Sequence, residues 1–172
     1  MSYRYIEIRE HNVAFSLPAT STGRAQSLRL LPVAYLQYYD NADYTDNLLE
    51  AKIELICVGH AVDYHDFFGV DSLEELYNAL SGPNRLGEAT ASLGGSEGLF
   101  SLEVTWREVE NDFHFLGRLP MPDFYYLKME RDPYYLRHAI RSVTEFEFCL
   151  ELDALSETAT ALGALLDHIR SL

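Results

Sequence analysis

The sequence predicts an α+β fold, made mainly of a twisted antiparallel β-sheet with a short middle helix and a C-terminal helix packed on one face. Apolar and polar residues alternate along segments 99–109, 113–119 and 143–152, which is typical of strands with one buried face. Segments 70–80 and 155–169 instead repeat apolar residues at helical spacing, which gives each one buried stripe. The two periodicities together predict the fold class.

The N-terminal half is predicted to supply further strands. Segments 3–9 and 13–17 are strand-like, with a hairpin turn between them. Segment 28–39 is apolar and rich in tyrosine, but Pro32 cannot donate to a central ladder. We therefore expect an edge strand there, or two short strands around a bulge. Segment 52–58 has apolar residues at both odd and even positions, which point to opposite faces of a strand. It therefore predicts a strand covered on both sides.

The middle helix is predicted over residues 70–80, with Asp71 or Ser72 as its N-cap. Its buried stripe comprises Leu73, Leu76, Tyr77 and Leu80. The closing helix is predicted to begin at a cap formed by Asp153 or Ser156. Its buried stripe comprises Leu155, Ala159, Leu162, Leu165, Leu166 and Ile169.

Between these helices, residues 88–119 predict an antiparallel meander with turns at 94–96 and 110–112, followed by a loop over 120–133. In the last strand, Phe146, Phe148, Leu150 and Leu152 are expected to face the core. The glutamates between them, Glu145, Glu147 and Glu151, are expected on the solvent-exposed face of the strand.

The chain of 172 residues fits a single domain, with 48% hydrophobic residues to fill one core. We predict one domain over 1–172, in which 1–85 supplies strands and the short helix, and 86–172 supplies the meander and the C-terminal helix. The two parts are expected to share one core. Whether their strands join one sheet is left open.

The formal net charge of −14 narrows the class of partner. It disfavours nucleic acid and anionic membranes, because their phosphates would be repelled. No run of 18 apolar residues and no signal peptide is visible. The two cysteines, Cys57 and Cys149, each lie in an apolar run and are interpreted as buried thiols of a cytoplasmic protein. Two interpretations of the negative charge remain: it attracts a basic partner, or it only keeps the protein soluble.

Few residues suggest chemistry. His60, Asp63 and His65 are a candidate metal or small-ligand site, but in a strand His60 lies on the face opposite the other two. We interpret the segment as a polar strand end that leads into Phe67 and Phe68. The cysteines have apolar neighbours, and no serine lies in a G-x-S-x-G motif. The sequence therefore predicts a protein that is not an enzyme and that holds no cofactor and no metal.

The acids are more informative. Residues 40–75 contain ten acids and a single base, Lys52, with aromatic residues between them. Tyrosine is enriched at interface cores, and opposite charge accelerates association with a basic protein. The alternative is that these acids only solvate the surface. The predicted partner-binding residues are Asp40, Asp43, Tyr44, Asp46, Asp63, Tyr64, Asp66, Glu74 and Glu75.

Three segments of the C-terminal half carry a resemblance: Gly-Glu-Ala-Thr-Ala at 87–91, the strand 99–106, and the strand 146–152 that runs into Asp153-Ala154-Leu155. Over residues 86–172 the chain resembles small immunity proteins of bacterial polymorphic toxin systems, particularly the WapI-type group. The resemblance implies a protein that binds and neutralises a cognate toxin, often a nuclease, and that is not an enzyme. It assigns no site residue.

Three functions therefore remain open. The first is an acidic protein-binding domain, an immunity protein for a basic toxin. The second is a metal-binding or small-ligand-binding protein or enzyme with a site near His60, Asp63 and His65. The third is a self-assembling structural protein that dimerises through the tyrosine-rich segment near Pro32. The sequence leaves monomer and homodimer both open.

Overall fold

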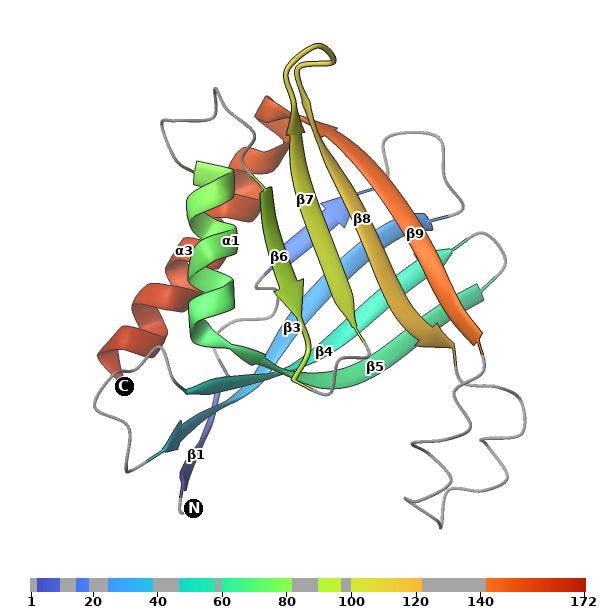
Figure 1. The fold of residues 1–172 in the computed structure, drawn as a ribbon. Coiled ribbons are helices and arrows are strands. Elements are labelled where there is room, and N and C mark those ends of the chain that lie inside the picture. The colour runs from blue at the N-terminus through green and yellow to red at the C-terminus, as the bar shows by residue number, and fades with distance from the viewer. Residues whose placement is uncertain are drawn as a thin grey trace.

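A computed structural model describes residues 3–9, 15–18, 25–38, 47–57, 60–81, 90–96, 100–121 and 142–172. Within these ranges the chain forms two antiparallel sheets and two α-helices, which confirms the predicted α+β class with a middle and a C-terminal helix. In Figure 1 the second sheet crosses in front of the first, and the two helices lie beside each other.

The first sheet, sheet A, contains β1 (Tyr3–Glu7), β2 (Phe15–Pro18), β3 (Ala25–Tyr38), β4 (Leu48–Cys57) and β5 (His60–Gly69). Its strand order is β1-β3-β4-β5, and β2 also pairs with β3. The strands β1 and β2 thus lie end to end along β3 instead of forming the expected hairpin.

The second sheet, sheet B, is the predicted meander: β6 (Thr90–Gly94), β7 (Ser101–Arg107), β8 (Asp112–Met121) and β9 (Ser142–Glu151), paired in that order. The expected turn before β8 is present, and Asn111 adopts a left-handed φ of 55° in it. β8 extends through Pro120 to Met121, and the rest of the predicted 120–133 loop lies outside the described residues.

The two halves of the chain form separate sheets because β5 passes directly into α1 (Val70–Ser81). An isolated bridge from Phe68 to Gly95 joins the end of β5 to the residue after β6. The buried faces of both sheets and both helices nevertheless contribute to a single hydrophobic cluster. Within it the rings of Phe68 and Phe100 pack edge to face at 5.6 Å.

The strand β3 differs from its prediction. It is not an edge strand, because β4 pairs along one side and β1 and β2 pair along the other. The bulge expected near Pro32 is present as a register shift between Pro32 and Ala34. On the opposite side, Pro32 falls between the residues that pair with β2 and those that pair with β1. A central strand tolerates this proline because the ladder is interrupted there.

Strand β4 is buried on one side only. Leu49, Ala51, Ile53 and Leu55 face the core, whereas Ile56 is 40% exposed. The prediction that this strand is covered on both sides is therefore wrong at Ile56. The outer face of sheet A is accessible at Tyr3, Tyr5 and Ile56, whereas Ala34 and Leu36 on the same face are buried.

A buried asparagine joins β3, β4 and α1. Asn47 Nδ2 donates to the Tyr35 hydroxyl at 2.8 Å, and Asn47 Oδ1 accepts from the Tyr38 backbone N–H at 2.7 Å. The Asn47 carbonyl accepts from the Val70 N–H at 3.1 Å. The helix consequently begins at Val70, before the expected caps, and Asp71 Oδ1 accepts from the N–H of Ser72.

Both predicted helical stripes are confirmed. Leu73, Leu76 and Leu80 of α1 are buried and Tyr77 packs against the core. α3 (Ser156–Ser171) follows a 3-10 turn (Leu152–Leu155) and buries its whole predicted stripe. Its N-cap residue is Leu155, whose apolar side chain cannot accept a hydrogen bond, so the predicted cap at Asp153 or Ser156 is wrong. Ser156 Oγ donates instead to the Asp153 carbonyl. Neither described helix is long and apolar enough to cross a membrane.

Candidate functional site

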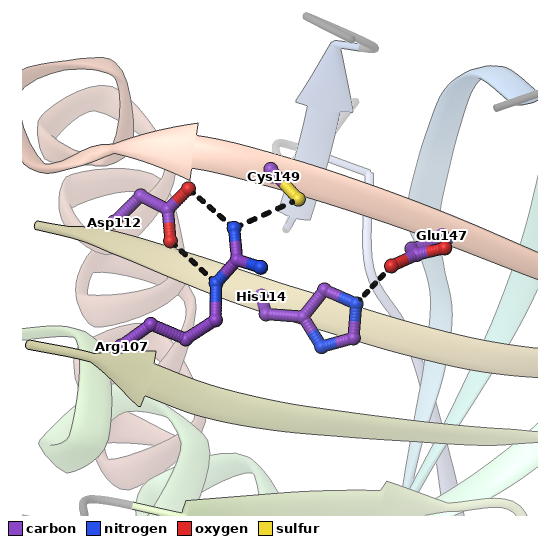
Figure 2. A network of polar contacts seen from close by, with 5 residues as sticks. All are labelled: Arg107, Asp112, His114, Glu147 and Cys149. Carbon is purple, nitrogen blue, oxygen red and sulfur yellow. Dashed lines mark hydrogen bonds and ion pairs between the residues drawn. The ribbon is translucent and has the colours of Figure 1, made fainter. Parts of the chain in front are cut away.

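Two polar clusters stand on the outer faces of the sheets. The first, the sheet B network, comprises Arg107, Asp112, His114, Glu147 and Cys149 (Figure 2). Strand alternation places these side chains outward, because the neighbours Phe113, Phe115, Phe148 and Leu150 are buried.

Strand register brings the network together. The tight turn through Asn111 sets Arg107 opposite Asp112 across β7 and β8. The pairing of β8 with β9 sets His114 opposite Cys149. Glu147 lies two residues before Cys149, so both side chains leave β9 on the same face. Backbone hydrogen bonding thus fixes the relative positions of residues up to 42 apart in the sequence.

The guanidinium of Arg107 is held from two sides. Its Nε and Nη2 donate to the two carboxylate oxygens of Asp112 at 2.8 and 2.7 Å, and Nη2 also donates to Cys149 Sγ at 3.3 Å. The hydrogen bond to Asp112 raises the pKa of Arg107 above its ordinary value. A permanently charged guanidinium therefore lies beside the thiol of Cys149.

His114 and Glu147 form the other half of the network. His114 Nε2 and Glu147 Oε1 are hydrogen-bonded, and this pair is visible on the right of Figure 2. The ligand atoms of His114, Glu147 and Cys149 all lie within 4.8 Å of one another. Imidazole, carboxylate and thiol are the three commonest protein ligands of zinc. The cluster is thus chemically suited to a transition metal.

Sequence reasoning missed this cluster. Cys149 was interpreted as a buried thiol in an apolar run, but its side chain is half-buried on the outer face. The alternation of Phe148 and Leu150, which face the core, already placed Cys149 among the outward residues. Glu145 and Glu147, predicted on the wet face, are indeed exposed. The contribution of His114 depends on pairing that no local pattern encodes.

The second cluster, the tyrosine face, lies on the outside of sheet A and comprises Tyr3, Tyr5, Tyr38, Glu50 and His65. Tyr3 and Tyr5 are 50% and 52% exposed. The rings of Tyr3 and Tyr38 lie 5.8 Å apart across the β1–β3 pairing. Tyrosine is enriched at the cores of protein interfaces.

Glu50 joins three strands of the tyrosine face. Its Oε2 accepts from the Tyr5 hydroxyl at 3.0 Å, and its Oε1 lies 3.8 Å from Nδ1 of His65. Burial raises the pKa of Tyr5 above its ordinary value of 10.0, and the hydrogen bond to Glu50 raises it further. The Tyr5 hydroxyl therefore remains a neutral donor to Glu50 at physiological pH.

The neighbouring charges on sheet A are paired. Glu54 accepts from Arg29 at 3.2 Å and from Lys52 at 3.0 Å. Lys52, the single base in the acidic stretch, therefore neutralises an acid of its own strand. Among the acids of residues 40–75 whose side chains are described, Glu50 and Glu54 lie on β4, Asp66 lies on β5, and Asp71, Glu74 and Glu75 lie on α1.

The predicted partner-binding residues are distributed over several environments. Asp66 is only 1% exposed and shares the inward face of β5 with Phe68, so it does not belong to an outer surface. Its Oδ1 accepts from the Phe67 N–H at 2.7 Å. Glu74 of α1 is half-buried and pairs with Arg170 of α3 at 2.6 Å, and Glu75 is exposed.

The remaining predicted partner-binding residues are less fully described. Asp63 and Tyr64 belong to the backbone of β5, but their side chains lie outside the described part. Asp40, Asp43, Tyr44 and Asp46 lie outside the described residues altogether.

The alternative metal ligands, His60, Asp63 and His65, do not lie together on one face of the strand. β5 is continuous from His60 to Gly69, so residues 60 and 63 lie on opposite faces of the strand. His65 is exposed beside Glu50 on the tyrosine face, and the side chains of His60 and Asp63 lie outside the described part. The strand geometry does not bring the two histidines together.

No family model, no curated protein and no solved structure matches this chain.

Proposed function

We propose that this protein is an acidic, cytoplasmic protein-binding domain that neutralises a basic partner, in the manner of the immunity proteins its C-terminal half resembles. The observation that carries the proposal is the tyrosine face, where Tyr3 and Tyr5 are half-exposed and the Tyr5 hydroxyl donates to Glu50. The partner class that fits is a basic toxin such as a nuclease. No catalytic step is part of the proposal.

The chemistry of the tyrosine face suits a protein partner. A tyrosine offers a large rigid apolar surface and a hydroxyl at low entropic cost, which is why it recurs at binding hot spots. Because Tyr5 already donates to Glu50, its ring is held in one orientation before any partner arrives. A partner would therefore meet a preorganised anchor, with Tyr3 and Tyr38 extending the aromatic area.

The charge distribution supports a basic partner. Exposed acids on the two helices include Asp71, Glu75, Glu157 and Asp167, whereas Arg170 is the only lysine or arginine of α1 and α3. With a net charge of −14, the whole molecule attracts a positively charged protein before contact. A nuclease is basic where it holds its phosphate substrate, so this field would direct the inhibitor toward that surface.

The test is capture of the partner followed by a mutational series. The tagged protein is purified from its own host at low salt, and a captured basic protein is then produced alone for binding measurements. We expect an association rate that falls steeply with ionic strength. For a nuclease partner, the complex is expected to lose nuclease activity.

The matched variants locate the interface. Tyr5→Ala is expected to weaken binding by about 2 kcal/mol or more, the size of a hot-spot truncation. Val109→Ala, at the 95% exposed tip of the β7–β8 turn, is expected to leave binding unchanged. Equal affinities for Tyr5→Ala and the wild type would refute the tyrosine face as the contact surface. Sedimentation of the protein alone distinguishes a foreign partner from a second copy of this chain.

A further inference from the structure

We propose that His114, Glu147 and Cys149 form a binding site for a divalent transition-metal ion, with zinc as the best-matched metal, on the outer face of sheet B. The site is independent of the proposed partner-binding function, because it lies on the other sheet. It also differs from the metal set considered from the sequence, His60, Asp63 and His65.

The backbone already holds the three ligands in reach of one ion. His114 and Cys149 are directly opposite each other in the β8–β9 register, and Glu147 is the diagonal neighbour of His114 on the same face. Their ligand atoms lie within 4.8 Å of one another. Zinc bonds of about 2.0 to 2.3 Å place tetrahedral ligands about 3.3 to 3.8 Å apart. Small side-chain rotations therefore suffice to complete the site.

The charges balance at the site. A thiolate and a carboxylate together carry two negative charges, which match a divalent cation, and a neutral imidazole completes the set. The nearby positive charge of Arg107 is compensated by its bidentate contact with Asp112. Binding the ion therefore leaves no uncompensated charge among the five residues of the network.

The groups around the ligands act as a supporting shell. Arg107 Nη2 donates to Cys149 Sγ at 3.3 Å, and Asp112 fixes the orientation of that guanidinium. Hydrogen bonds of this kind orient metal ligands and are a regular part of metal centres. The hydrogen bond between His114 and Glu147 likewise keeps both side chains directed toward each other before the ion arrives.

The ligand chemistry selects the class of metal. A thiolate and an imidazole favour zinc, cobalt, nickel and copper over magnesium and calcium, which prefer oxygen ligands. Three protein ligands leave a fourth position open to water or to an atom of another molecule. Glu147 is exposed and His114 and Cys149 are half-buried, so an ion can reach the site directly from solvent.

Cobalt provides a direct spectroscopic test on the full chain. Titration of the reduced protein with Co²⁺ is expected to produce a near-ultraviolet thiolate-to-cobalt band and tetrahedral visible bands, saturating at one ion per chain. Zinc is expected to displace the cobalt and abolish both signals. Magnesium at the same concentration is expected to leave them unchanged. Absence of a thiolate band in the wild type would overturn the proposal.

Variants identify the ligands. Cys149→Ser is expected to remove the thiolate band, and His114→Gln and Glu147→Gln are each expected to weaken cobalt binding at least tenfold. Two controls are matched: Cys57→Ser removes the other cysteine, and Glu145→Gln removes an exposed carboxylate of the same strand face. Both are expected to bind cobalt as the wild type does. A band that survives Cys149→Ser, or one lost with Cys57→Ser, contradicts the assignment.

A second readout does not depend on the folding of any variant. Zinc is expected to slow alkylation of Cys149 in the wild-type protein by at least tenfold, measured by mass spectrometry of the labelled peptide. Alkylation of Cys149 at the same rate with and without zinc would also contradict the site.

Discussion

The outer faces of the two sheets differ in how their polar residues are used. On sheet B the five polar side chains form two hydrogen-bonded groups that lie next to each other, Arg107 with Asp112 and Cys149, and His114 with Glu147 (Figure 2). On sheet A, Tyr3 and Tyr5 are about half exposed, the hydroxyl of Tyr5 donates to Glu50, and the ring of Tyr3 lies beside that of Tyr38. The first arrangement suits an ion held between side chains. The second suits a protein laid across them.

The comparison shows that strand alternation alone does not determine the use of a surface. Both faces carry glutamates at alternating positions, but only the face of β9 was predicted to be exposed to solvent, whereas β4 was predicted to be covered on both sides. The two faces differ in the partners of these glutamates. Glu147 is hydrogen-bonded to a histidine, whereas Glu50 accepts from a tyrosine hydroxyl and lies farther from His65.

The largest expected effect is on the support of sheet A. Asn47→Ala removes the hydrogen bonds of the Asn47 amide to the Tyr35 hydroxyl and to the Tyr38 N–H. Removing one partner of a buried hydrogen bond costs about 1 to 3 kcal/mol, so we expect the free energy of unfolding to fall by about 2 to 4 kcal/mol in urea titrations. Asn78→Ala, on the exposed face of α1, is the control and is expected to change it by less than about 0.5 kcal/mol. Similar losses in both variants would refute the role of Asn47.

A corresponding variant tests sheet B. A Cβ on Gly117 would lie 2.1 Å from Cζ of Phe146, whose ring covers this glycine across the β8–β9 pairing. Gly117→Ala is expected to lower the free energy of unfolding by about 1 to 3 kcal/mol through overpacking. Gly94→Ala is the matched control, since a Cβ there meets nothing within 4 Å. The measurement is the midpoint temperature of thermal unfolding of both variants. Equal midpoints for Gly117→Ala and Gly94→Ala would contradict the close packing of Phe146 on Gly117.

The Arg107–Asp112 contact should be modest in energy. The Arg107 side chain is 34% exposed, so solvent screens the pair. A double-mutant cycle with Arg107→Ala and Asp112→Ala is expected to give a coupling energy of about 0.5 to 1 kcal/mol. A coupling near zero would mean that the contact does not orient the guanidinium beside Cys149.

The smallest expected effect is on the titration of Tyr5. Its pKa is raised in the folded protein, so its contribution to stability is present below pH 10 and is lost as the pH rises through the folded value. Glu50→Gln removes the charge and is expected to lower the pKa of Tyr5 toward 10.0. The difference in tyrosinate absorbance between each protein and its Tyr5→Phe counterpart reports this shift. An unchanged pKa in Glu50→Gln would show that the carboxylate does not act on Tyr5.

The local elements could be predicted from the sequence because periodicity reports which face is buried. The α1 stripe, the α3 stripe and the meander follow directly from it. Long-range pairing could not be predicted, because the register of β1 and β2 against β3 is not encoded in any local pattern. For the same reason Pro32 was interpreted as an edge residue although the ladder is interrupted around it.

The candidate sites were predicted less well. Asp66 could have been placed on the inward face, because it lies two residues before the buried Phe68 on the same strand. Cys149 could have been placed outward by the same rule. The hydrogen bond from Tyr5 to Glu50 joins residues 45 apart, and the one between His114 and Glu147 joins residues 33 apart. Such contacts depend on how the strands assemble, so composition indicated an acidic, tyrosine-rich protein without locating its surfaces.

The most direct test of the separation between the two faces is a crossed measurement on two variants. The affinity for the captured basic partner and the cobalt thiolate band are recorded for Tyr5→Ala and for Cys149→Ser. We predict that Tyr5→Ala loses partner affinity and keeps the cobalt band, whereas Cys149→Ser keeps partner affinity and loses the band. Loss of partner affinity in Cys149→Ser, with Tyr5→Ala unaffected, would contradict the account.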